Sequence, residues 1–247
     1  MYVRFVHFGL FVAVALSITT QALAAGDKSL AYSAAERGDY ATAFHEFQLL
    51  AESGDLYAQY NLAYLYQKGL GSTVDIPKAI HWYQTALARG FGSAGFNLAL
   101  MYDQGDGVKQ DPVRAAYYYK EAAKNGQVKA MTNLGFMYRS GRGVEKSGEN
   151  TFRYFEMAAY LGEGNAQDEL GVMYGNGEWV KKDYVKAYAW FSVSLTQGTP
   201  GAERNQRLAL GRLTAQQRAA GDKLAEQYQA EIKRRIAAEK EKAEQHL

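Results

Sequence analysis

Hydrophobic and small residues recur along this chain with a period of 36 residues. Each period is marked by a glycine, with an aromatic residue seven positions before it and an alanine four positions after it. Because a period of about 20–50 residues is typical of stacked supersecondary units, the pattern predicts a solenoid. The glycines are Gly54, Gly90, Gly126, Gly162 and Gly198, the aromatics are Phe47, Tyr83, Tyr119, Phe155 and Phe191, and the alanines are Ala58, Ala94, Ala130, Ala166 and Ala202.

Two helices are predicted in each period. In the first complete period, apolar residues with helical spacing end at Gly69, a favourable residue for terminating a helix. A second apolar face begins after Asp75, a favourable N-cap residue, and ends at Gly90. Neither helix could bury its apolar face alone, so neighbouring units are expected to bury these faces jointly. Equivalent N-cap residues recur as Asp39, Asp111, Ser147 and Asp183.

The end of the chain is predicted to be one long amphipathic helix. Thr214 and Gln217 have the spacing of a capping box, and Gly221 is the last glycine after them. Apolar residues then recur every four positions among lysines, arginines and glutamates. We expect the first half of this helix to cap the solenoid, since a terminal repeat needs a polar outer face. The apolar residues are Leu224, Tyr228, Ile232 and Ile236.

The repeated segments resemble Sel1-like repeats, relatives of tetratricopeptide repeats. The resemblance lies in residues 58–66 (AQYNLAYLY), 130–138 (AMTNLGFMY) and 78–83 (KAIHWY). It implies an all-α fold, a right-handed α/α solenoid of helix-turn-helix repeats. We therefore divide the chain into four parts, of which the first is predicted from its composition. They are a signal peptide (1–24), N-terminal capping helices (25–54), repeats (55–213) and a C-terminal amphipathic helix with a charged tail (214–247). The repeat units are 55–90, 91–126, 127–162, 163–198 and a partial unit, 199–213.

The first 24 residues have the composition of a secretory signal peptide. They contain a single charge, Arg4, then an apolar run over 8–16, and small residues Ala22 and Ala24 before the expected cleavage point. The run is short for a membrane span, although an uncleaved anchor is the alternative. No later segment is apolar enough to suggest stable membrane insertion after cleavage. The sequence therefore predicts a periplasmic or secreted protein.

Composition narrows the possible chemistry. The net charge of +2 indicates no basic surface for nucleic acid, and the absence of cysteine excludes disulfides and zinc–thiolate sites. His45 and His81 have no acidic partner at ligand spacing, so no metal or other cofactor is predicted. The paired loop glycines lack the spacing of phosphate-binding loops and are expected to end helices. Without a nucleophile and base, the chain is predicted not to be an enzyme.

Four asparagines recur in the middle of predicted helices, where asparagine has low helix propensity. They are Asn61, Asn97, Asn133 and Asn205. We expect each to make a structural hydrogen bond to a neighbouring repeat rather than to bind a ligand.

The non-repeated positions of each first helix are candidates for partner binding. By resemblance to tetratricopeptide repeats, these helices line a concave groove. Exposed aromatic residues in such a groove are typical of protein-binding hot spots, although several could pack against the next repeat instead. The predicted binding residues are Tyr57, Tyr60, Tyr64, Gln67, Phe96, Leu100, Asp103, Lys129, Thr132, Phe136, Arg139 and Asp168.

The sequence predicts an exported, non-catalytic scaffold that binds a protein or peptide. The resemblance implies a role in an envelope assembly, secretion or signalling complex. The alternative is a glycan or peptidoglycan-fragment binding protein, in which the groove aromatics would stack on sugar rings.

Overall fold

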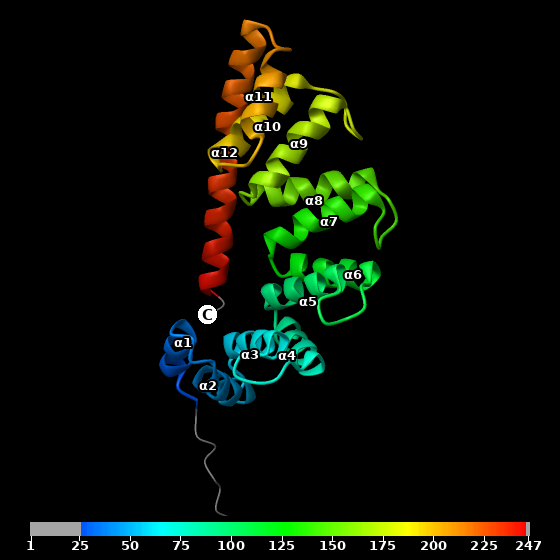
Figure 1. The fold of residues 1–247 in the computed structure, drawn as a ribbon. Coiled ribbons are helices and arrows are strands. Elements are labelled where there is room, and N and C mark those ends of the chain that lie inside the picture. Colours follow the sequence, from blue (N-terminus) through cyan, green and yellow to red (C-terminus); the bar gives the residue numbers. More distant parts are fainter. Residues whose placement is uncertain (1–25, 246–247) are drawn as a thin grey trace, which may run out of the picture.

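The computed structural model describes residues 26–245, which form an α-helical solenoid (Figure 1). The predicted signal peptide lies outside the described residues. No strand occurs in the described part of the chain, and the predicted all-α solenoid is confirmed. The helices are α1 (Lys28–Glu36), α2 (Tyr40–Glu52), α3 (Leu56–Lys68), α4 (Ile76–Ala88), α5 (Gly92–Gln104), α6 (Pro112–Lys124), α7 (Val128–Ser140), α8 (Gly148–Tyr160), α9 (Gly164–Asn176), α10 (Tyr184–Thr196), α11 (Ala202–Leu210) and α12 (Ala215–Gln245).

Each repeat unit is a pair of helices that stacks on the next pair (Figure 1). The predicted helix ends are confirmed. Asp75 and Ser147 accept a hydrogen bond from a backbone N–H three residues later, at the start of the second helix. Gly69 and Gly141 end the first helix in the left-handed conformation. Glycine ends every first helix from α3 to α9, aspartate or serine caps every second helix from α4 to α10, and α2 to α10 all contain 13 residues.

The core consists of small residues that face aromatic rings. Ala130 has no exposed surface, and neither does the ring of Phe155 in the second helix of the same unit. A Cβ atom on Gly135 would lie 2.5 Å from the Phe155 ring, and one on Gly171 would lie 2.5 Å from Phe191. These rings therefore pack directly against helix backbone, and glycine is needed where the approach is closest.

The recurring asparagines connect successive units. Three of them donate a side-chain hydrogen bond to the first helix of the preceding unit, as the sequence predicts, and the three acceptor residues occupy equivalent positions in their helices. The fourth, Asn133, follows a unit in which that position is Phe96, whose ring offers no acceptor. The bonded pairs are Asn61 with Tyr32 (3.3 Å), Asn97 with Tyr60 (3.2 Å) and Asn205 with Asp168 (3.1 and 3.0 Å).

The long helix α12 runs back beside the stack and contacts α10 and α8 (Figure 1). The Tyr228 ring stacks on Trp190 with ring centroids 4.1 Å apart, and Ile232 is buried. The Arg235 guanidinium lies 4.2 Å from the ring centroid of Tyr160. Helix α12 therefore covers second helices of the last units and leaves the face of the first helices uncovered.

Candidate functional site

One hollow spans three repeat units on the face formed by their first helices, and we call it the groove pocket. It has a volume of about 540 Å³. The lining comes from α5, α7, the start of α9 with the residue before it, and the loop between α10 and α11. Five of the predicted binding residues contribute to it: Phe96, Lys129, Thr132, Phe136 and Asp168. The other lining residues are Asn133, Glu163, Asn165, Glu169, Thr199 and Pro200.

Two phenylalanines form the apolar part of the groove pocket. Phe96 packs on Tyr119 with ring centroids 5.8 Å apart, and Phe136 packs edge-on against Phe155 at 5.0 Å. Tyr119 and Phe155 have no exposed surface, so both pocket rings rest on fixed core side chains. Phe136 remains 39% exposed. The groove pocket thus presents apolar surface that is already held in place.

The asparagine connection between units is interrupted at Thr132. At the equivalent position, Tyr60 and Asp168 accept a hydrogen bond from the asparagine of the next unit. The residue that would donate to Thr132 is Glu169, which forms an ion pair with Arg139. Thr132 is 6% exposed, and its hydroxyl has no hydrogen-bond partner among the described residues.

Asp168 is a half-buried carboxylate without a cation beside it. Its two oxygens accept hydrogen bonds from the side-chain amide of Asn205. No lysine or arginine among residues 26–245 forms an ion pair with it. Burial raises the pKa of the Asp168 carboxyl, and the hydrogen bond from Asn205 only partly opposes this effect. The carboxylate is therefore less well solvated than it would be in water.

The remaining charges leave the groove pocket with an excess of acid. Glu163 caps α9 by accepting a hydrogen bond from the Ala166 N–H at 2.8 Å, but within the described chain it has no ion pair. Glu169 is neutralised by Arg139. Lys129 is exposed and also forms no ion pair in the described part of the chain. Two carboxylates thus face one lysine.

The predicted aromatic residues of the first unit lie outside the groove pocket. Tyr57 and Tyr64 are 49% and 42% exposed, respectively. Tyr60 is half-buried and packs on Phe91 and Tyr83, with centroid distances of 5.2 and 5.7 Å. Tyr60 therefore packs against neighbouring side chains, which is the alternative stated for the groove aromatics in the sequence analysis. Leu100 is likewise half-buried and lies against the core.

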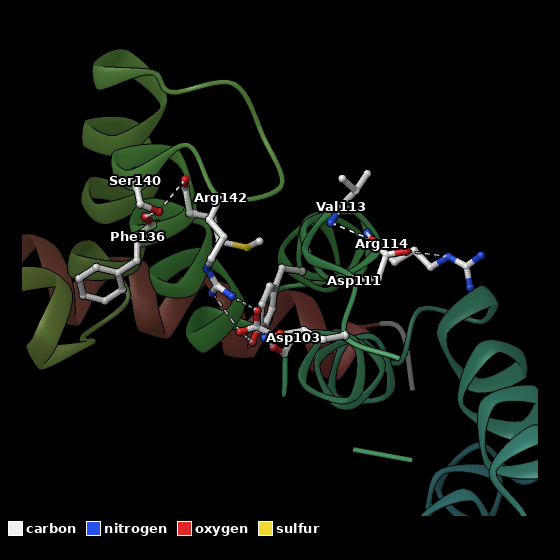
Figure 2. Close-up of polar contacts among 10 residues, drawn as sticks. Asp103, Asp111, Val113, Arg114, Phe136, Ser140 and Arg142 are labelled. Carbon is white, nitrogen blue, oxygen red and sulfur yellow. Dashed lines mark hydrogen bonds and ion pairs between the residues drawn. The ribbon is translucent and has the colours of Figure 1, made fainter. Parts of the chain in front are cut away.

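The other three predicted residues, Gln67, Asp103 and Arg139, form polar contacts with the loop of the next unit. Figure 2 shows Arg142 reaching Asp103 from the loop after α7. All three occupy the same position in the last turn of a first helix, so their side chains help to join units. The partners are Asp106 for Gln67 (2.9 Å), Arg142 for Asp103 (3.1 Å) and Glu178 for Arg139 (2.6 Å).

Part of the lining comes from residues outside the first helices, which a comparison of first-helix positions does not reveal. Glu163 immediately precedes α9, and Thr199 and Pro200 belong to the loop before α11. The recurrence of Asn133 predicts only a structural role for it, but its side chain also lines the groove pocket. Glu169 stands at a position that is asparagine in four other units, and this departure from the pattern is the signal that points to the region.

The chemistry available here is that of a binding surface. No group of three or more histidine, cysteine, aspartate or glutamate side chains within residues 26–245 is arranged to hold a metal ion. None of the described helices is both long enough and apolar enough to cross a membrane.

Two of the solved structures to which the chain is similar are those of proteins from Oxalobacter formigenes and uropathogenic Escherichia coli. A Sel1 repeat protein from Oxalobacter formigenes aligns with a TM-score of 0.68 and 28% identity over 73% of this chain and 74% of its own. A protective antigen of uropathogenic Escherichia coli with an SLR fold has a TM-score of 0.48 and 27% identity, covering 83% of this chain and 52% of its own. No curated protein sequence matches the chain.

The family match covers most of the solenoid. The Sel1 repeat pattern matches residues 56–91, 93–127, 128–163 and 164–198, which together are more than half of the chain. These segments correspond to the helix pairs from α3–α4 to α9–α10. Sel1 repeats generally serve as non-catalytic scaffolds for protein interactions. The chain belongs to the Sel1 repeat family.

Proposed function

We propose that this protein is an exported, non-catalytic scaffold that binds a segment of a protein partner in the groove pocket. Its place would be in an envelope assembly, secretion or signalling complex. The observation that carries this proposal is the groove pocket itself, in which Phe96 and Phe136 lie beside unpaired charged groups. Export is supported by the composition of the first 24 residues.

The physical basis is burial of apolar surface at a prepared site. Phe96 and Phe136 already rest on core rings, so little side-chain freedom would be lost when a partner covers them. Aromatic side chains at the centre of an interface commonly contribute most of the binding energy. A protein segment could use the apolar rings and the polar rim of the groove pocket together.

Replacing Phe96 and Phe136 together by alanine should weaken partner binding by about 2 kcal/mol or more, which is roughly 30-fold in Kd. The measurement is capture of envelope proteins on the immobilised wild-type and variant proteins, followed by titration of the captured partner. The matched control is Tyr117→Ala, because Tyr117 is 58% exposed and lies on α6, outside the groove pocket. Circular dichroism melts would show that the variants remain folded.

A single stoichiometric partner that is lost in the Phe96→Ala/Phe136→Ala variant and retained in Tyr117→Ala supports the proposal. Equal binding by all three proteins would place the interface elsewhere. If no protein is captured and the wild type binds peptidoglycan fragments, the glycan alternative replaces a protein partner.

Export has its own test. Expressed from its full coding sequence in a bacterial host, the protein should reach the periplasm or medium and begin at Ala25. Intact mass spectrometry of the exported form measures this directly. A chain that still begins at Met1 would contradict a cleaved signal peptide.

A further inference from the structure

We infer that the groove pocket receives a basic side chain, lysine or arginine, of the bound protein segment. The inference rests on the proposed function, because it specifies which chemical group of a protein partner occupies the groove pocket.

The charge of Asp168 is not balanced by an ion pair among the described residues. Its carboxylate is half-buried and held only by the neutral amide of Asn205, with hydrogen bonds of 3.1 and 3.0 Å. A desolvated carboxylate is stabilised most by a charged donor, and charge-assisted hydrogen bonds are about twice as strong as neutral ones. At the equivalent position the three preceding units have Tyr60, Phe96 and Thr132, none of them charged, and the partial fifth unit has Arg204. Among these equivalent positions only the fourth unit has an acid.

The groove pocket also has an apolar wall. Phe96 and Phe136 line the same groove pocket as Asp168. Lysine and arginine have an apolar stem and a charged head, so one such side chain can pack its stem on phenylalanine while its head reaches a carboxylate. The rings add a favourable cation–π contribution if the charged head passes over a ring face. The volume of about 540 Å³ is ample for one long side chain and its backbone.

Within the described chain, the other unpaired charges of the groove pocket are those of Lys129 and Glu163. Lys129 would repel a basic group, but it is exposed and therefore screened by water and salt. Glu163 lies on the same lining and has no ion pair among the described residues. The two unpaired acids, Glu163 and Asp168, are less exposed than Lys129. Their charges are therefore less screened, which favours a cation over an anion as the occupant.

The test is selection of a random heptapeptide display library on the purified protein. We expect the enriched peptides to contain a lysine or arginine that is required for binding. Fluorescence polarisation with one enriched peptide, and with the same peptide carrying glutamine at the basic position, then measures the contribution of that charge. The glutamine peptide should bind at least about tenfold more weakly, as expected for loss of a charge-assisted hydrogen bond.

Three variants assign the effect to Asp168. Asp168→Asn keeps the size of the side chain and should remove the preference for the basic peptide over the glutamine peptide. Lys129→Gln removes a repulsive charge and should strengthen binding of the basic peptide by a few-fold at low salt. Glu145→Gln removes one exposed acid of the loop before α8, outside the groove pocket, and should leave the preference unchanged.

The pH dependence follows from the same group. Burial raises the pKa of Asp168 above its ordinary value near 4, so the carboxylate takes up a proton at higher pH than an exposed aspartate. Affinity for the basic peptide should therefore fall as the pH is lowered through this pKa. The fall should be smaller in the Asp168→Asn variant, in which Glu163 is, among the described residues, the remaining unpaired acid of the groove pocket.

The outcomes separate this inference from the proposed function. Enriched peptides without a basic residue, or acidic ones, would overturn the inference; if their binding is still lost in the Phe96→Ala/Phe136→Ala variant, the proposed function stands. A basic preference that survives Asp168→Asn also overturns it. If no peptide binds and no envelope protein is captured, the proposed function fails as well.

Discussion

Replacing Tyr83 by alanine should lower the free energy of unfolding by about 3–5 kcal/mol, the usual cost of removing a buried aromatic ring. Tyr83 has no exposed surface. Its hydroxyl donates to Gln67 Oε1 at 3.0 Å and accepts from Asn97 Nδ2 at 3.1 Å. The substitution would leave a cavity between two units and also leave two amide side chains without this partner. Urea denaturation followed by circular dichroism measures the effect.

Tyr83→Phe and Tyr117→Ala are the controls. The phenylalanine variant keeps the ring and removes only the hydroxyl, so it should cost about 1–3 kcal/mol. Tyr117 is 58% exposed in the second helix of the next unit, and its replacement should change stability by less than about 0.5 kcal/mol. If Tyr83→Ala unfolds at the same urea concentration as the wild type, the ring does not hold the two units together.

Replacing Gly143 by alanine should be more destabilising than the same change at Gly126. Both glycines have left-handed backbone, with φ of +73° and +75°. A Cβ atom at Gly143 would lie 2.1 Å from the carbonyl oxygen of Pro112, at the start of α6 in the preceding unit. At Gly126 nothing lies within 4 Å of the added atom. The first change therefore combines backbone strain with a collision, and the second has strain alone.

The expected magnitudes follow from these two contributions. Left-handed strain costs about 1–2 kcal/mol for a residue with a Cβ atom. Displacing the packed backbone near Pro112 adds about 1–3 kcal/mol at Gly143. Thermal and urea unfolding of the two variants gives the difference directly. Equal stability of Gly143→Ala and Gly126→Ala would show that the loop after α7 yields to the added atom without cost.

The loop of the fourth unit packs differently against the preceding helix, and the difference depends on two residues that only the tertiary structure brings together. Gly143 lies in the loop after α7, and the equivalent residue in the loop after α9 is Trp179. Trp179 keeps a left-handed φ of +57°. Its ring lies where a Cβ atom of Gly148 would be, at 2.2 Å. Gly148 stands where the earlier unit has Pro112. The large side chain of Trp179 is thus accommodated because the facing residue at the start of α8 is Gly148, which has no side chain.

The repeat architecture could be predicted because it depends on local and periodic information. Asp75 begins a helix by accepting a backbone N–H, and Gly69 ends one because it adopts positive φ without a Cβ clash. Both effects act within a few residues of the chain. The 36-residue recurrence then implies that neighbouring units bury each other's apolar faces.

The candidate site could be predicted only in part. Phe96, Lys129 and Phe136 can be identified because they occupy first-helix positions whose residue type differs between units, and all three line the groove pocket. The same criterion also selects Arg139, although its charge is paired with Glu169 and Glu178 of the next unit and is not available to a partner. Whether a charge is free depends on the residue that lies opposite it, and that residue is about 30–39 positions away in the chain.

The sequence by itself determined the helix boundaries, the stacking of units and the aromatic character of the first-helix face, since each follows from residue type and period. The tertiary structure alone decided which of those side chains bind a neighbouring unit and which remain available. Tyr60 packs on Phe91, whereas Asp168 has only the Asn205 amide. The difference arises because burial and charge pairing are properties of residues brought together by stacking, and a one-dimensional pattern carries no distances between them.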